Sequence, residues 1–67
     1  MKVKDLIAVS TADYYKIIDC GKESVFNLDR VSELLALFGE REIYVLTALT
    51  SDALEIIVKQ DGDYMKF

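Results

Sequence analysis

The chain has 67 residues, and its 12 acidic and 8 basic residues give a formal net charge of −4. It contains one cysteine and no histidine, which excludes an internal disulfide, a histidine-dependent nucleophilic triad and the usual zinc sites. The acidic charge argues against general affinity for nucleic acid or for an anionic membrane surface.

The sequence is apolar for its length. Hydrophobic residues make up 52% of it, whereas a domain of this size buries only about 60% of its unfolded surface. We therefore expect one domain, residues 1–67, that is stabilised by self-association. No apolar run reaches 18 residues, no signal-like core follows Met1–Asp5, and a lone cysteine suits a reducing cytosol. These features predict a cytoplasmic protein with no membrane partner.

The first ten residues predict a short amphipathic helix. Val3, Leu6 and Ile7 follow the i, i+3, i+4 spacing of a helix. The alternation of a strand fits the same residues less well.

A first β-hairpin is predicted from Tyr14–Asp19 and Glu23–Asn27, after a loop at residues 10–13. A type II′ turn at Gly21-Lys22 would give glycine the positive φ. Its register places apolar pairs on both faces of the hairpin: Ile17 opposite Phe26, and Ile18 opposite Val25.

The clearest helix is predicted between two hairpins, at Leu28–Phe38. Its apolar stripe has helical spacing and consists of Leu28, Val31, Leu34, Leu35 and Phe38. Asn27 or Asp29 is placed to cap its start, and Gly39 is expected in the left-handed conformation that ends many helices.

The second hairpin, Ile43–Lys59, is the most informative segment. A turn at Thr50–Ala53 pairs the strands so that one face is almost wholly apolar. That face carries Leu49 with Leu54, Thr47 with Ile56, and Val45 with Val58. The other face carries Ala48 with Glu55, Leu46 with Ile57, and Tyr44 with Lys59. Leu46 and Ile57 are then covered either by their own chain, as in a central strand, or by a partner subunit.

These elements predict an α+β fold: a four-stranded, mostly antiparallel sheet of two hairpins, one main helix between them and a short N-terminal helix. One helix cannot cover both faces of such a sheet. We therefore predict an interface at Leu46, Ile57, Tyr44, Ile18 and Val25. The tail 60–67 ends on large apolar residues and is expected either to be disordered or to dock on a neighbour.

Carboxylates are the only residues with catalytic potential, because two or more that converge on Mg²⁺ can support phosphodiester chemistry. Asp13 and Asp19 bracket the first strand and are the candidate catalytic residues. Asp52, Asp61 and Asp63 are further turn aspartates, which more often only form turns. Cys20 is expected to be a silent surface cysteine, since the negative charge of a neighbouring aspartate raises the pKa of a thiol.

Nucleic-acid binding would rest on isolated cations, with tyrosines as stacking partners. The candidates are Lys16, Lys22, Arg30 and Lys59. Lysines on strand faces ordinarily serve only solubility, so the alternative is a solvated surface.

Three segments resemble small proteins encoded by phages and prophages of Firmicutes. They are Met1–Ile7, Asp13–Asp19 and Asp52–Val58, and the resemblance spans most of the chain. A few similar proteins are anti-CRISPR proteins, including a compact β-rich kind with the fold of a transcriptional positive cofactor. The resemblance implies a homo-oligomer in the bacterial host cytoplasm that acts on DNA topology and hinders a type II CRISPR nuclease.

Three functions therefore stay open. The first is an interaction protein of a mobile element that binds a host or CRISPR protein, as the negative charge and surplus apolar surface suggest. The second is a DNA-binding or DNA-nicking protein that uses Asp13, Asp19 and Mg²⁺. The third is a structural or assembly component of a phage particle. No cofactor is expected outside the nicking alternative.

Overall fold

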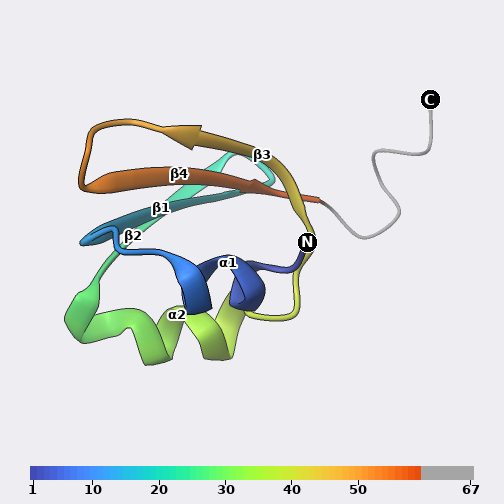
Figure 1. The fold of residues 1–67 in the computed structure, drawn as a ribbon. Helices are drawn as coiled ribbons and strands as arrows, with labels where there is room; N and C mark the ends of the chain where they lie inside the picture. The colour runs from blue at the N-terminus through green and yellow to red at the C-terminus, as the bar shows by residue number, and fades with distance from the viewer. Residues whose placement is uncertain (60–67) are drawn as a thin grey trace.

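The computed structural model describes residues 1–59, and it confirms the predicted α+β fold. Both helices lie on one side of a four-stranded sheet (Figure 1). In this range no helix is long and apolar enough to cross a membrane. The predicted tail, 60–67, lies outside the described residues. The elements in chain order are α1 (Val3–Val9), β1 (Tyr14–Asp19), β2 (Lys22–Asn27), the 3₁₀ turn η1 (Leu28–Arg30), α2 (Val31–Phe38), β3 (Ile43–Ala48) and β4 (Ala53–Val58).

The strand order is β2-β1-β4-β3, so the last strand is inserted between the first and the third. Each hairpin is antiparallel, and the parallel pairing of β1 with β4 joins the two hairpins into one sheet. The sequence of β4, Ala-Leu-Glu-Ile-Ile-Val, is almost continuously apolar, as expected of a strand with neighbours on both sides. The edges of the sheet are β2 and β3.

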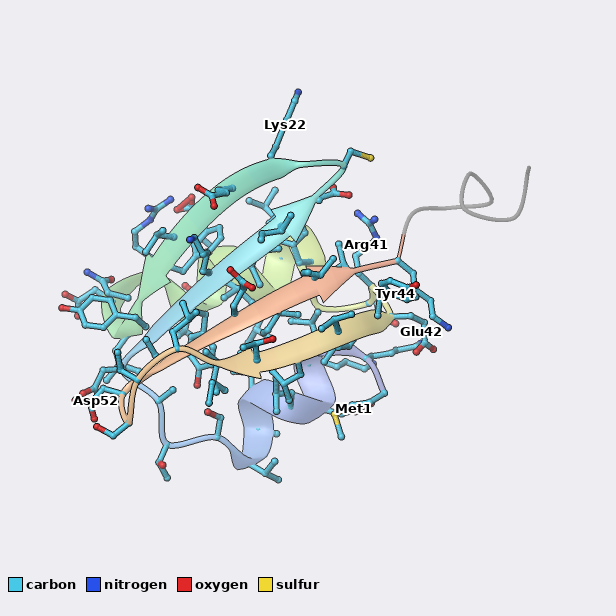
Figure 2. All side chains as sticks on the ribbon, turned by 90° about the horizontal axis from the view of Figure 1, so that it is seen from above. Met1, Lys22, Arg41, Glu42, Tyr44 and Asp52 are labelled. Carbon is cyan, nitrogen blue, oxygen red and sulfur yellow. The ribbon has the colours of Figure 1, made fainter. Side chains whose placement is uncertain are left out.

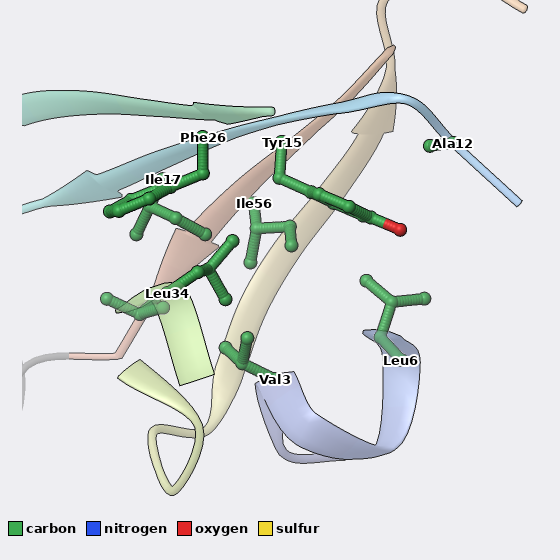
Figure 3. Close-up of a cluster of buried hydrophobic side chains, with 9 residues drawn as sticks. Val3, Leu6, Ala12, Tyr15, Ile17, Phe26, Leu34 and Ile56 are labelled. Carbon is green, nitrogen blue, oxygen red and sulfur yellow. The ribbon is translucent and has the colours of Figure 1, made fainter. Parts of the chain in front are cut away.

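The core lies wholly between the sheet and the two helices (Figure 3). The sheet contributes Tyr15, Ile17 and Ile56, which point toward Leu34 of α2 and Val3 of α1. An edge-to-face pair of rings, Phe26 and Phe38, extends this core, with centroids 6.1 Å apart. The buried set is Val3, Leu6, Ala12, Tyr15, Ile17, Phe26, Leu34, Ile56 and Val58.

The turn of the first hairpin lies one residue earlier than predicted. Its two central residues are Cys20 and Gly21, with φ of 53° and 79°, rather than Gly21 and Lys22. Positive φ at both positions is typical of a type I′ turn, whose twist matches that of the strands. The pairing shifts by two residues, to Ile17 opposite Ser24. An even shift preserves faces, so the predicted apolar sets stay together.

The register of the second hairpin differs from the prediction by one residue. Leu46 pairs with Ile56 and Val45 with Ile57, with an irregularity between Ile43 and Val45. The N–H groups of Leu49 and Thr50 both donate to the Ala53 carbonyl, at 2.9 and 3.3 Å, which closes the loop at residues 49–52. A shift of one residue exchanges the two faces of a strand. The predicted pair of Leu46 and Ile57 is therefore wrong: these residues lie on opposite faces.

Gly39 ends α2 in a right-handed conformation, with φ of −54°, and not in the predicted left-handed one. Its N–H donates to the Leu35 carbonyl oxygen at 2.9 Å, and a Cβ at this position would lie 2.5 Å from that oxygen. Close approach of the backbone therefore requires glycine here. The predicted side-chain cap is also missing at the start of the helix, where Asn27 makes no capping hydrogen bond.

Candidate interaction surface

The face of the sheet opposite the helices is uncovered in residues 1–59, and we call it the helix-free face (Figure 1). Its residues alternate along each strand with the buried ones. Three predicted interface residues, Ile18, Val25 and Ile57, lie on this face. Tyr44 lies at the irregularity that begins β3 and is 66% exposed. Leu46 belongs to the helix side, where it is 44% exposed because it lies on an edge strand.

Charged side chains occupy the middle of the helix-free face. The Lys16 ammonium lies 3.1 Å from a Glu23 oxygen and 3.8 Å from a Glu55 oxygen. Lys16 is directly opposite Val25 on one side and Glu55 on the other, so this ion-pair group crosses three strands. The apolar residues of the face are consequently divided into two groups.

The outer edge of β3 presents unpaired backbone groups. Leu49 N donates to Ala53 O, and bonded and unbonded pairs alternate along an antiparallel ladder. Val45 and Thr47 therefore bond to β4, whereas the N–H and C=O groups of Leu46 and Ala48 point outward. Within residues 1–59, no strand pairs with this part of the edge.

The two edges of the sheet differ in how they are protected. On β2, Lys22 and Glu23 supply charges, and Arg30 donates from Nη1 to the Val25 carbonyl at 3.1 Å. Charges and covering groups of this kind normally prevent an edge from pairing with another chain. On β3, no residue from Ile43 to Ser51 is charged. Only the β3 edge combines free backbone groups with an uncharged sequence.

The N-terminal residues cover the beginning of the β3 edge. Lys2 forms an antiparallel bridge with Glu42, and Ile43 N donates to the Met1 carbonyl at 2.9 Å. Figure 2 shows Met1 and Glu42 close to one end of β3, and Asp52 at the other. The open part of the edge therefore runs from residue 44 to residue 49, a length of about 17 Å.

Asp19, one of the two candidate catalytic residues, is held in an ion pair. The Arg41 guanidinium donates to both of its carboxylate oxygens at 3.0 Å and to the Lys59 carbonyl at 2.6 Å. This hydrogen bonding keeps the pKa of Asp19 below its ordinary value, with a further hydrogen bond from the Cys20 thiol. The contacts join the ends of β1 and β4 to the segment before β3.

The structure does not bring the two candidate catalytic carboxylates together. Asp13 precedes β1 and Asp19 ends it, so their backbones are about 20 Å apart. Asp13 instead lies beside Asp52, since Asp13 N donates to the Asp52 carbonyl at 2.7 Å. In residues 1–59 no group of three His, Cys, Asp or Glu side chains is placed to hold a metal ion. The predicted Asp61 and Asp63 lie outside the described residues.

The candidate nucleic-acid residues are dispersed, and two of them are already paired. Lys16 is bound by two glutamates, and Arg30 donates to Glu33 at 2.8 and 3.2 Å. The Arg30 guanidinium also lies 4.8 Å from the centre of the Phe26 ring. Lys22 lies at the outer edge of β2, and Lys59 follows β4. These four cations therefore do not form one basic surface, and Tyr15 is buried and cannot stack on a base.

The open edge was not predicted from the sequence, because whether a strand lies at an edge depends on the order of the strands in the sheet. The uncharged run from Ile43 to Ser51 is visible in the sequence, and so is its strong β-propensity. Whether β3 is central or at an edge depends on the pairing of β4 with β1, which local patterns do not specify. An uncharged β-run without proline is the signal that could have raised the question.

Comparison with protein-family models, with curated proteins and with solved structures finds no match to this chain. The resemblance to phage proteins therefore stays a prediction.

Proposed function

We propose that the protein is a non-catalytic interaction module that binds an extended segment of another polypeptide as an added strand on β3. The observation that carries this proposal is the open edge, where the N–H and C=O groups of Leu46 and Ala48 point outward from an uncharged strand. Strand addition to an exposed sheet edge is a common mode of peptide recognition.

The added strand would gain both backbone and side-chain contacts. Its backbone would pair with Leu46 and Ala48, and each such hydrogen bond contributes about 1 kcal/mol net. Its side chains would meet exposed residues of β3 on both faces: Val45 on the helix-free face and Leu46 on the helix side. Cross-strand neighbours of this kind supply the specificity, because the backbone bonds are common to all sequences.

Amide hydrogen exchange tests this proposal residue by residue. A display library of random nine-residue peptides is selected against the full chain, and exchange is measured with and without an enriched peptide. The Leu46 and Ala48 amides should become protected on binding. The Val45 and Thr47 amides serve as internal controls, because they already bond to β4.

Two proline variants provide the matched control. Ala48→Pro removes an outward N–H from β3, and Val25→Pro removes one from β2, where the Val25 N–H also points away from its partner strand. We expect enriched peptides to lose at least tenfold in affinity for Ala48→Pro and to bind Val25→Pro normally, with thermal unfolding confirming that both variants fold. Peptides that bind both variants equally, or a selection that enriches none, would contradict the proposal.

Inhibition of a type II CRISPR nuclease is the specific form of this function that the resemblance implies. The net charge of −4 supports it only in general terms, because such a nuclease presents basic surfaces to nucleic acid. Cleavage of a target plasmid by the guide-loaded nuclease, with increasing amounts of this protein and of Ala48→Pro, tests this prediction. Undiminished cleavage would contradict inhibition of the CRISPR nuclease, but it would not contradict the proposal of strand binding on β3.

A further inference from the structure

We infer that the strand bound on β3 belongs to a class of ligands with an apolar centre and basic residues beyond the end that lies near Asp13 and Asp52. This inference rests on the proposed function and concerns the chemistry of its ligand. It follows from the two carboxylates at one end of the open edge, from the position of α1, and from the steric cost of placing a second copy there.

Two acidic residues lie at one end of the open edge, and its centre has none. Asp52 lies in the loop after β3 (Figure 2). Glu42, where β3 begins, is already paired with the Met1 ammonium at 3.2 Å. Asp13 adds a second carboxylate at the Asp52 end, since its backbone is bonded to that of Asp52 at 2.7 Å. In the described part of the chain, neither Asp13 nor Asp52 forms a salt bridge. A ligand with lysine or arginine beyond the end of its strand that lies nearest Asp13 and Asp52 would supply the missing countercharges.

The helix α1 gives the ligand a second apolar surface. α1 lies on the helix side of the sheet, and Figure 2 shows part of it extending past β3, beneath the position of an added strand. Val9, near its end, is 76% exposed, and Leu46 on the same side of the sheet is 44% exposed. The helix-free side of the added strand would meet Val45 and Leu49, which are 39% and 46% exposed. Apolar side chains are therefore favoured on both faces of the ligand.

The same helix disfavours a second copy of this chain as the ligand. If two copies paired β3 with β3 across a two-fold axis, their helices would lie on the same face of the joined sheet. Each α1 extends past its own edge, so the two helices would compete for the space beneath the joined strands. An extended segment that carries no helix layer of its own avoids this conflict.

Two synthetic peptides test the ligand class. Both have the centre Thr-Val-Ile-Val-Thr, and one carries two lysines at each end whereas the other carries two glutamates. We expect the lysine peptide to bind the full chain at least fivefold more tightly at low salt. This difference in affinity corresponds to the combined contribution of a few exposed ion pairs. The difference should shrink at high salt because exposed charges are screened. Fluorescence anisotropy measures both affinities.

Four variants locate the contacts. Asp52→Lys should weaken binding of the lysine peptide and strengthen that of the glutamate peptide, whereas Asp29→Lys, the same change of an exposed residue in η1, should do neither. Val9→Lys should weaken both peptides because it adds a charge to the exposed surface of α1, the helix that extends past β3. Leu37→Lys, on α2, is its control, since Leu37 is 60% exposed but lies on the other helix.

The possible outcomes distinguish a failure of this inference from a failure of the proposed function. If both peptides protect the Leu46 and Ala48 amides with equal affinity, the ligand class is wrong and strand addition stands. If neither peptide protects them but library peptides do, the same conclusion follows. If these amides are protected in the free protein in a concentration-dependent way, and Thr47→Lys abolishes that protection, a second copy occupies the edge and the inference is overturned.

Discussion

Arg41 links three parts of the fold with one guanidinium group. It binds the Asp19 carboxylate at the end of β1 and the carbonyl of Lys59 after β4, and it immediately precedes the segment that leads into β3. The side chains of Arg41 and Asp19 are 24% and 30% exposed, so the pair is screened less than an ion pair in open solvent. Such bidentate, charge-assisted pairs are among the stronger polar contacts in proteins.

Acid should weaken the fold through these carboxylates. The pKa of Asp19 is lowered from 3.8 by Arg41, and that of Glu40 is lowered from 4.5 to about 2 by Lys4 and Lys2. Groups with a lowered folded pKa stabilise the fold above their unfolded pKa, and this contribution is lost as pH falls through the folded value. We expect the free energy of unfolding to fall between about pH 4 and pH 2, and Asp19→Asn to make this decline shallower.

At neutral pH, Asp19→Asn should lower the free energy of unfolding by about 1–3 kcal/mol, because it removes the charge that Arg41 binds. Urea titrations at several pH values measure both effects. Asp29→Asn is the control, since Asp29 makes no ion pair within residues 1–59. An unchanged acid slope in Asp19→Asn would show that the ion pair is not formed in solution.

The turn of the first hairpin should be sensitive to substitution at Gly21. Its φ of 79° is costly for residues with a side chain, although a Cβ there would meet no atom within 4 Å. Gly21→Ala should therefore cost about 1–2 kcal/mol of stability for conformational reasons alone. Gly21→Asn should cost less, because asparagine tolerates this region. Equal losses for both variants in thermal unfolding would argue against the type I′ turn.

At the scale of elements, β4 holds the sheet together. It is one of the two central strands, and it pairs with β3 of its own hairpin and with β1 of the other. α1 has seven residues and is too short to be stable in isolation. It is held by outside contacts: Val3 N donates to Arg41 O at 2.9 Å, and the Lys4 ammonium lies 2.7 Å from Glu40.

A cavity in the centre of β4 should therefore destabilise the whole fold. Ile56 has no exposed surface, and Ile56→Ala should cost about 2–5 kcal/mol. Val25→Ala, on the edge strand β2 and 54% exposed, should cost less than about 0.5 kcal/mol. Chemical denaturation of the two variants compares them directly. Similar losses at the two positions would mean that the sheet order is not the one described.

For the whole molecule, net charge and exposed apolar surface act against each other. A charge of −4 repels a second copy, whereas the apolar residues of the helix-free face favour association. The ion-pair group around Lys16 separates those residues, which limits the area that two copies can bury without desolvating charges.

The predicted self-association should consequently be weak and should increase with salt, because salt screens the repulsion between copies. Sedimentation velocity at tens of micromolar, at low and high ionic strength, measures it. Val25→Asp should reduce it by adding charge to the helix-free face. Binding of the lysine peptide has the opposite salt dependence, which distinguishes the two processes. A mass that falls as salt rises would contradict the apolar origin of the association.

Local patterns in the sequence were sufficient for the elements of this fold. The spacing of Val3, Leu6 and Ile7 predicted α1, and the stripe from Leu28 to Phe38 predicted the helix between the hairpins. Both strands of each hairpin were also found. These successes depend on residues close in sequence, whose periodicity reports which side of an element is buried.

Predictions that depended on a single residue of register or on long-range pairing failed. The irregularity near Tyr44 shifts β3 by one residue and separates Leu46 from Ile57. Nothing local in Ile43–Val45 marks that shift. Asp13 and Asp19 lie at opposite ends of β1, which keeps them apart within one chain, and their catalytic role stays a prediction.

The insertion of β4 between β1 and β3 has a consequence for the folding of the chain. Until β4 pairs with its neighbours, the two hairpin regions share no neighbouring strand, and the inner sides of β1 and β3 are both exposed. In that state β3 has two open edges and no charge along its length, the condition in which a partly folded chain most readily pairs with a wrong partner. Docking of β4 is thus the step that leaves the described sheet with one uncharged open edge instead of several.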